Sequence, residues 1–360
     1  MLKLISDWYR QNFCDPQVAI LSLLLLVGTT IILFAGELLA PLLAAIIIAY
    51  LLDGGVLFLQ DKKIPRLLAV IIVFALFMLL VLAVLLILFP LLLDQAKQFV
   101  GAIPSMIANI QTALFKLPEQ YPALITEKTV SDIILSARQQ ASLLSQELLS
   151  LRLLASLVDL LSVMVYSVIV PLLIFFFLKD KEKIIVWLQS YLPKDRQLVS
   201  RVWLDVNSKI AGYVRGKFIE ILITWIVTYI AFLWFDLNYA LLLSFAVGIS
   251  VLVPYIGAIV VTIPVAIVAY FQWGYGSEFI YLLITYTIIQ FLDGNLLVPL
   301  LFSEMVNLHP AAIIVAVLVF GGLWGFWGIF FAIPLATLVN AVLQAWPKVR
   351  AETCPPTPRA

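Results

Sequence analysis

Five acidic side chains occupy a long stretch of sequence that holds no basic residue. From Phe218 to Pro347 the chain runs for 130 residues without a lysine or an arginine. Asp293 lies inside an apolar block of this stretch, and Glu304 shortly precedes another. An ionised carboxylate in an apolar environment costs several kcal/mol unless a cation or water compensates it. Both residues are therefore candidates for binding a proton or a metal cation, which is the chemistry that an ion-coupled carrier needs.

The other three acids of this stretch have simpler explanations. Asp236 and Glu278 flank apolar blocks, so we expect them in loops. Glu220 follows Arg215 and Lys217 within two helical turns, so we expect it to pair with one of them at the cytoplasmic rim of a membrane span. Arg215 itself is the candidate residue for the cytoplasmic mouth of a transport pathway, and Glu220 is a further candidate for the pathway.

Two long apolar blocks are each interrupted by glycine and proline. Residues 239–272 are interrupted at Val253-Pro254-Tyr255-Ile256-Gly257, and residues 310–346 between positions 321 and 328. Similar sequences follow both interruptions, which suggests a weak internal repeat. Paired interruptions predict discontinuous helices that expose backbone groups within the membrane, although helix–loop–helix hairpins packed through small residues give the same pattern. The candidate hinge residues are Pro254, Gly257, Pro264, Gly322, Gly325, Gly328 and Pro334.

The composition of the whole chain is that of a membrane protein. Of its 360 residues 64% are hydrophobic and 12% are charged, against about 45–50% and about 25% in soluble domains. The apolar residues form blocks, and roughly 20 residues suffice for a helix to cross a ~30 Å hydrocarbon core. The sequence predicts an all-α, polytopic membrane protein with about eight membrane segments, some broken or re-entrant. The apolar blocks are 18–36, 38–52, 67–93, 157–178, 218–235, 239–272, 279–300 and 310–346.

The distribution of charge predicts how the chain is divided and oriented. Region 179–217 holds nine basic and four acidic residues, and short loops rich in lysine and arginine stay in the cytoplasm. Block 38–52 can be a short span, the second arm of a hairpin with 18–36, or a re-entrant segment. Both termini are cytoplasmic if the two blocks form a hairpin with a water-exposed corner at Glu37. The predicted regions are N-terminal membrane segments (1–93), an extracytoplasmic helical region (94–156), a span (157–178), a basic cytoplasmic helical region (179–217), C-terminal membrane segments (218–346) and a cytoplasmic tail (347–360).

Both polar regions contain amphipathic helical patterns. In the outer region apolar residues recur at 3- and 4-residue steps from Val130 to Ala155, and a shorter pattern covers 103–117. These helices are expected to form a packed lid or, alternatively, a contact with a neighbouring subunit. In the cytoplasmic region the apolar positions from Val199 to Tyr213 share one face, so this basic helix can lie on an anionic membrane surface.

No motif supports catalysis or a bound cofactor. A single histidine, His309, excludes the His-Glu-x-x-His zinc motif, and it is expected to begin a helix at the membrane edge. Cys14 and Cys354 are too far apart in sequence to suggest a metal site. The segment Gly248-Ile249-Ser250 matches an intramembrane serine protease only loosely, because valine replaces the second glycine. We therefore expect no enzyme activity, cofactor, metal site or nucleic-acid partner.

Taken in order, several segments resemble the autoinducer-2 exporter family of permeases, and within it the PerM-like branch. Each motif alone is weak, but together they are specific and cover nearly the whole chain. The region 94–156 is the least diagnostic part. The matching segments are Pro41–Leu52, Pro171–Asp180, Gly212–Lys217, Val253–Gly257, Asp293–Asn295, Glu304–Pro310, Phe320–Gly328 and Ile333–Ala336.

The resemblance implies a multi-pass protein of the bacterial inner membrane, embedded in the lipid bilayer and assembled as a homo-oligomer. Some family members are linked to export of autoinducer-2, and others to sodium (or lithium)/proton antiport. Autoinducer-2 is a small, neutral, polyhydroxylated molecule, so its recognition would need hydrogen-bonding groups such as Tyr255, Gln290 and Asn295. The expected function is a secondary transporter for such a solute, in which Asp293, Asn295 and Glu304 carry a proton or cation. A sodium(lithium)/proton antiporter and a non-transporting oligomeric scaffold are the alternatives.

Overall fold

The computed structural model describes residues 16–114, 135, 139, 157–191, 197–254, 256–302 and 309–345. Over these residues the chain forms helices joined by short turns, and no strand occurs among them. Two helical stretches contain five-residue π-helical turns, η1 and η3. The elements are α2 (Pro16–Asp61), α3 (Arg66–Ala83), η1 (Val84–Leu88), α4 (Phe89–Leu114), α7 (Leu157–Lys179), α8 (Lys181–Ser190), α9 (Gln197–Trp234), α10 (Ala240–Ser250), α11 (Ile256–Trp273), α12 (Ser277–Leu292), η3 (Asp293–Leu297), α13 (Val298–Phe302) and α14 (Pro310–Ala345).

The predicted all-α membrane fold is confirmed. Five helical stretches of the described residues are long and apolar enough to cross a membrane, and four shorter apolar helices accompany them. Apolar side chains such as Leu76, Leu79 and Leu86 are about two-thirds exposed, which suits a helix surrounded by lipid. The five long stretches are Leu39–Asp61, Arg66–Met106, Val202–Trp234, Ile256–Trp273 and Ser277–Phe302.

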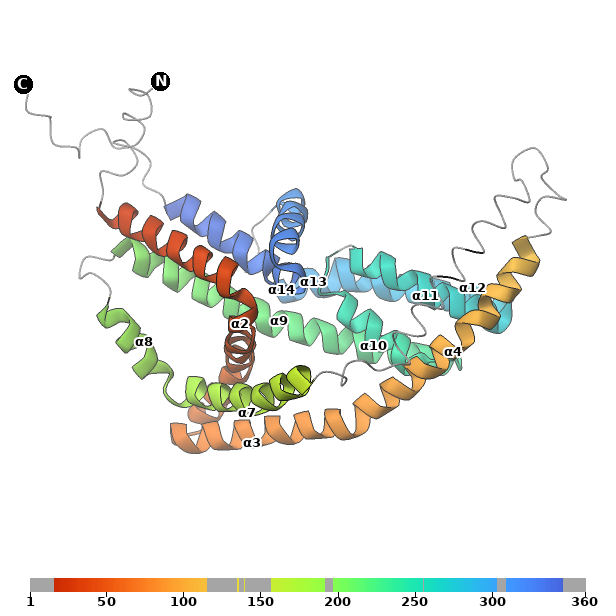
Figure 1. The fold of residues 1–360 in the computed structure, drawn as a ribbon, viewed down its shortest axis with the longest axis horizontal. Helices are drawn as coiled ribbons and strands as arrows, with labels where there is room; N and C mark the ends of the chain where they lie inside the picture. Colours follow the sequence, from red (N-terminus) through yellow and green to blue (C-terminus); the bar gives the residue numbers. More distant parts are fainter. Residues whose placement is uncertain are drawn as a thin grey trace, which may run out of the picture.

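The predicted hairpin with its turn at Glu37 is wrong. Helix α2 continues through this position for 46 residues, with Pro41 inside it. A helical hairpin needs a loop of about 2–5 residues, and a single residue between two apolar blocks is too short to reverse the chain. Instead α2 bends partway along its length (Figure 1), and a proline inside a helix is the usual cause of such a bend.

Two further predicted boundaries fall inside continuous helices. The shorter outer pattern, 103–117, begins as the end of α4 and follows directly from the preceding span. Helix α9 joins the predicted cytoplasmic helix and the next predicted span into one helix of 38 residues. The longer outer pattern, 130–155, lies outside the described residues except for positions 135 and 139.

Both predicted interruptions are present. The first separates α10 from α11 at residues 251–255. The second lies within α14 at Gly325, whose backbone angles of φ 57° and ψ −132° break the helix. Only glycine adopts this combination readily, because it has no Cβ. Each interrupted block therefore consists of two consecutive apolar helices.

Helix α9 is the centre of the fold. It runs through the middle of the molecule and packs against α2, α10, α12, α13 and α14 (Figure 1). Beyond Trp234 the chain turns back into α10, and Gln272 of α11 holds this turn through hydrogen bonds to Asp236 and Asn238. Asp236 is exposed in the turn, as predicted, whereas Glu278 is exposed in the first turn of α12 rather than in a loop.

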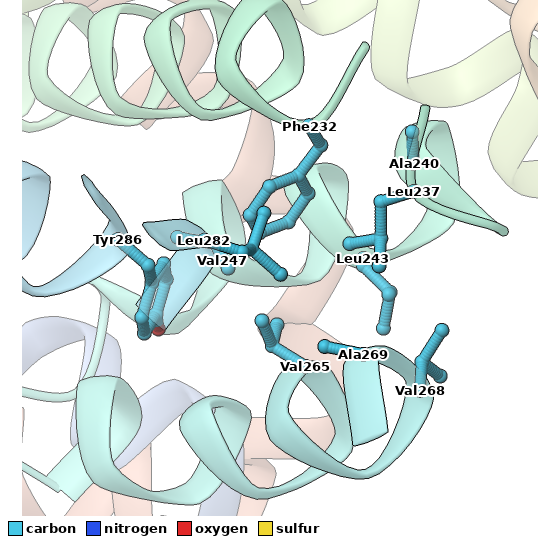
Figure 2. Packing of buried hydrophobic residues seen from close by; sticks show 10 residues of the cluster. All are labelled: Phe232, Leu237, Ala240, Leu243, Val247, Val265, Val268, Ala269, Leu282 and Tyr286. Carbon is cyan, nitrogen blue, oxygen red and sulfur yellow. The ribbon is translucent and has the colours of Figure 1, made fainter. Parts of the chain in front are cut away.

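One end of this assembly is a closely packed core cluster. Side chains from α9, α10, α11 and α12 interdigitate there without a charged group among them (Figure 2). Phe232, Val265 and Leu282 are fully buried, and the rings of Phe232 and Tyr286 lie 6.1 Å apart. The core cluster consists of Phe232, Leu237, Ala240, Leu243, Val247, Val265, Val268, Ala269, Leu282 and Tyr286.

Candidate functional site

A cavity of about 390 Å³ lies where α9, the α10–α11 interruption, the α12–η3–α13 stretch and α14 meet. Its wall is mainly apolar, with a small group of polar and charged side chains. This combination is typical of sites for small molecules. The lining residues are Tyr213, Lys217, Glu220, Val251, Val253, Pro254, Ala258, Ile259, Gln290, Asp293, Gly294, Val298, Phe302, Ile313 and Ile333.

A buried ion pair contributes two of the charges. The ammonium nitrogen of Lys217 donates to Oε2 of Glu220 at 2.8 Å, and the two residues are only 5% and 2% exposed. They are three residues apart on α9, which places them on the same helix face. Both lie near the middle of the 33-residue apolar stretch Val202–Trp234. Of the two partners expected for Glu220, the structure selects Lys217.

Asp293 contributes the third charge, at the start of the π-helical turn η3. Its Oδ1 accepts a hydrogen bond of 2.7 Å from the hydroxyl of Thr224, one helical turn beyond Glu220 on α9. Single π-turns are frequent at functional sites, since they redirect side chains that a regular helix would place elsewhere. Asp293 also lies within electrostatic range of Lys217. The sequence had suggested a carboxylate without a nearby cation, and the fold supplies one from α9.

We call Lys217, Glu220 and Asp293 the buried charge cluster, in which Lys217 and Glu220 are buried and Asp293 is half-buried. With all three residues ionised it carries a net charge of −1. A buried net charge is costly in an apolar surrounding, so one additional positive charge would neutralise the cluster. A proton or one monovalent cation meets this requirement.

Aromatic side chains form the wall next to the cluster. The ammonium group of Lys217 lies 5.7 Å from the ring centre of Phe302, within the range of a cation–π contact. The rings of Phe302 and Tyr213 lie 5.7 Å apart. Gly216 lets Phe302 come this close to α9, since a Cβ there would lie 2.8 Å from the phenyl ring.

A chain of hydrogen bonds leads from the cavity toward the core cluster. Gln290, which lines the cavity, donates to the hydroxyl oxygen of Tyr286 at 3.0 Å. The hydroxyl of Thr262 donates to the backbone oxygen of Ala258 at 2.7 Å, so the 3.3 Å contact with Tyr286 is donated by the tyrosine. These bonds connect α12 to α11 and hold one wall of the cavity in place.

The two interruptions are built alike around one glycine each. A Cβ at Gly257 would overlap the backbone oxygen of Ser250, and a Cβ at Gly328 would overlap that of Phe320. In both places the second helix starts against a backbone carbonyl of the first. Pro254 lines the cavity beside the first interruption. These close contacts support the repeat that the sequence suggested.

The other candidate hinge residues have different roles. Pro264 and Pro334 lie inside helices, where neither one separates two elements. Gly322 is exposed and has open space beside its α-carbon. The break within α14 is at Gly325.

Not all predicted pathway residues reach the cavity. Asn295 is exposed and donates to the backbone oxygen of Phe291. Arg215 lies on the side of α9 that faces α2, against Gly54. His309 accepts a hydrogen bond from the backbone of Ala311 and immediately precedes α14, as expected for a residue at a helix start. Tyr255 and Glu304 lie outside the described residues.

Lys217, Thr224 and Phe302 were not among the predicted pathway residues. For α9 a signal was present in the sequence. Polar residues occur at steps of three and four from Lys217 through Glu220 and Thr224 to Thr228, and all of them are buried. Polar residues with helical spacing in an otherwise apolar span indicate a face directed away from lipid. Phe302 offered no comparable signal, because one phenylalanine among many apolar residues does not stand out.

Comparison with known proteins extends these observations to the whole chain. The family model described as AI-2E family transporter matches residues 21–348. A protein of Escherichia coli strain K12 that carries the permease name PerM is 46% identical over 347 residues, covering 96% of this chain and 98% of that protein. A protein of Bacillus subtilis strain 168 that carries the transport-protein name YueF is 26% identical over 345 residues, covering 92% of each chain.

Proposed function

Because the chain belongs to the AI-2E transporter family, a family of multi-pass membrane proteins, we propose that it is a secondary transporter that exports a small polar solute such as autoinducer-2. The solute would occupy the cavity beside the interruption between α10 and α11. The observation that carries the proposal is the buried charge cluster in the wall of this cavity. A scaffold would gain nothing from three ionisable groups placed there, since burying them is costly.

The cluster would couple solute movement to an ion. Asp293 is its exchangeable member, because it is bound to a neutral hydroxyl, whereas Glu220 is neutralised by Lys217. A proton or cation taken up by Asp293 on one side of the membrane would be released on the other. Gln290 lies in the same wall, and its amide can bond to a polyhydroxylated solute. Tyr255 and Glu304 stay predicted pathway residues.

Two ion pairs support a common cytoplasmic side for two predicted inner loops. Lys181 binds Asp53 at 2.8 Å, and Arg66 binds Glu182 at 2.7 Å. The α2–α3 connection and the α7–α8 junction therefore lie together at one end of the helices. In a bacterial inner membrane this basic end would face the cytoplasm. Assembly into a homo-oligomer and a cytoplasmic C-terminus stay predictions, whereas the cytoplasmic position of the N-terminus depended on the hairpin that the continuous helix α2 excludes.

The proposal is tested with purified protein in liposomes that contain a pH-sensitive dye. A pH gradient is imposed, and autoinducer-2, sodium or lithium is then added outside. We expect a change in internal pH on adding autoinducer-2, with a rate that saturates as its concentration rises. A response to sodium or lithium alone would favour the antiporter instead. No response to any addition, from oligomeric and correctly inserted protein, would contradict ion-coupled transport.

A further inference from the structure

We propose that Lys217 makes the buried charge cluster selective for protons by occupying the position that sodium or lithium would need. This inference rests on the proposed function, because it concerns the ion that binds at the coupling site. The starting observation is that Lys217 itself is the cation of the cluster. Its ammonium group is 2.8 Å from Glu220, and both side chains are almost completely buried.

A proton and a sodium ion make different demands on such a site. A proton needs one carboxylate oxygen, and Asp293 offers one without disturbing the pair between Lys217 and Glu220. A sodium ion in a membrane carrier instead needs several oxygen ligands, usually carboxylates together with carbonyl and hydroxyl groups. Glu220 is already engaged by Lys217, so sodium would have to displace the ammonium group or bind beside a like charge.

The other residues of the cavity wall do not compensate for this competition between Lys217 and a sodium ion. On α9 the titratable groups that line the cavity are Tyr213, Lys217 and Glu220, and on η3 the only one is Asp293. The described lining residues from the α10–α11 interruption, α11, α12, α13 and α14 carry no charge. Thr224 and Gln290 add one hydroxyl and one amide oxygen nearby. Without Lys217, two carboxylates and these two oxygens would form a set of hard ligands that suits sodium or lithium.

The inference makes a prediction of gained function. In the Lys217→Met variant the apolar stem is largely kept and the charge is lost, so the cluster carries −2. We expect sodium and lithium to bind this variant at least about tenfold more tightly than the wild-type protein, since a like charge within the site has been removed. Its thermal unfolding temperature should rise when sodium replaces N-methylglucamine, whereas that of the wild-type protein should not change.

The double variant Lys217→Met/Glu220→Gln is the matched control. It removes the positive charge without leaving Glu220 unpaired, and its net charge of −1 comes from Asp293 alone. We expect it to fold and to show no stabilisation by sodium, because the second carboxylate is missing. If the single variant does not fold, the wild-type protein still decides the question. Internal pH in liposomes should then respond to autoinducer-2 at the same rate with sodium or with N-methylglucamine outside.

Two results would overturn the inference. One is a sodium-specific or lithium-specific stabilisation or pH response of the wild-type protein. The other is a folded Lys217→Met variant that ignores sodium. A folded Lys217→Met variant that ignores sodium leaves the proposed function untouched, and so does sodium stabilisation of a wild-type protein whose internal pH still responds to autoinducer-2. Conversely, a wild-type protein that shows no pH response to any solute or ion would refute the proposed function, whatever the variants bind.

Discussion

The cavity and the core cluster are built on the same helices, yet their chemistry is opposite. One face of α9 is buried along its length, from Lys217 and Glu220 through Thr224 and Thr228 to Phe232. At its beginning this face carries an ion pair, and at its end it carries a phenyl ring. The facing stretch changes in the same way, since Asp293 lies beside Thr224 and Tyr286 lies beside Phe232.

This difference separates residues that act on a solute or ion from residues that hold the helices together. In lipid, helices associate through close packing rather than through exclusion of water. The core cluster supplies that packing for α9–α12 (Figure 2). It also closes the space between α9 and α12 beyond Tyr286, so an ion bound at Asp293 meets packed rings on that side. Changes in the two regions should therefore alter different measurable quantities.

The largest effect is expected at the close backbone contact between α10 and α11, because both the cavity and the core cluster depend on it. Gly257→Ala would place a Cβ onto the backbone oxygen of Ser250, so the close approach of α10 and α11 could not form. We expect a loss of more than about 4 kcal/mol in stability and little folded protein, measured by size-exclusion chromatography and thermal unfolding. Gly322→Ala is the matched control, because open space surrounds that glycine. Equal yields of the two variants would show that the close contact is not required.

A smaller and purely structural effect is expected in the core cluster. Leu282→Ala removes a fully buried side chain between α11, α12 and α9. Such a cavity should lower the free energy of unfolding by about 2–5 kcal/mol, while the transport rate per folded molecule stays the same. Ile284→Ala on the exposed side of α12 is the control and should cost much less. Unfolding in detergent together with flux in liposomes tests this, and a flux defect in folded Leu282→Ala protein would contradict the separation.

The smallest effect is expected for a polar residue outside the cavity. Asn295 follows Asp293 by two residues but is exposed, and it bonds to its own helix. Asn295→Ala should therefore change flux by less than about twofold, because no solute contact is lost. Gln290→Ala, in the cavity wall, provides the comparison and should weaken the apparent affinity for the solute. If the Asn295 variant had the larger defect, the assignment of the pathway would have to move to the other side of η3.

The sequence predicted the structure best where a residue pattern has a direct physical consequence for the backbone. Long apolar blocks predicted the helices, and the glycine and proline positions predicted both interruptions, since these residues limit where a helix can continue. The absence of basic residues from 218–347 made Asp293 and Glu220 candidates, and the fold brings both to one cavity. Their relation could not be read from the sequence, because 73 residues separate them and only the packing of η3 on α9 brings them together.

The errors have physical causes too. The turn at Glu37 was inferred from a charge between two apolar blocks, but a helical backbone satisfies its own hydrogen bonds and continues through such a position. The predicted boundary between the cytoplasmic helix and the next span lies after Lys217, because basic residues precede it. In the structure α9 continues through this boundary as one helix, and Lys217 is buried within it.

The most direct measurement compares Asp293→Asn with the wild-type protein in the same liposome assay, with thermal unfolding measured in parallel. The amide keeps the size of the side chain and its contact with Thr224, but it cannot carry an exchangeable proton or charge. Glu278→Gln, at the exposed start of α12, is the matched control and should transport normally. We expect Asp293→Asn to lose coupled flux and to remain as stable as the wild-type protein, or to become more stable. Normal coupled flux in a folded Asp293→Asn variant would remove this carboxylate from the mechanism and contradict an ion-coupled cavity.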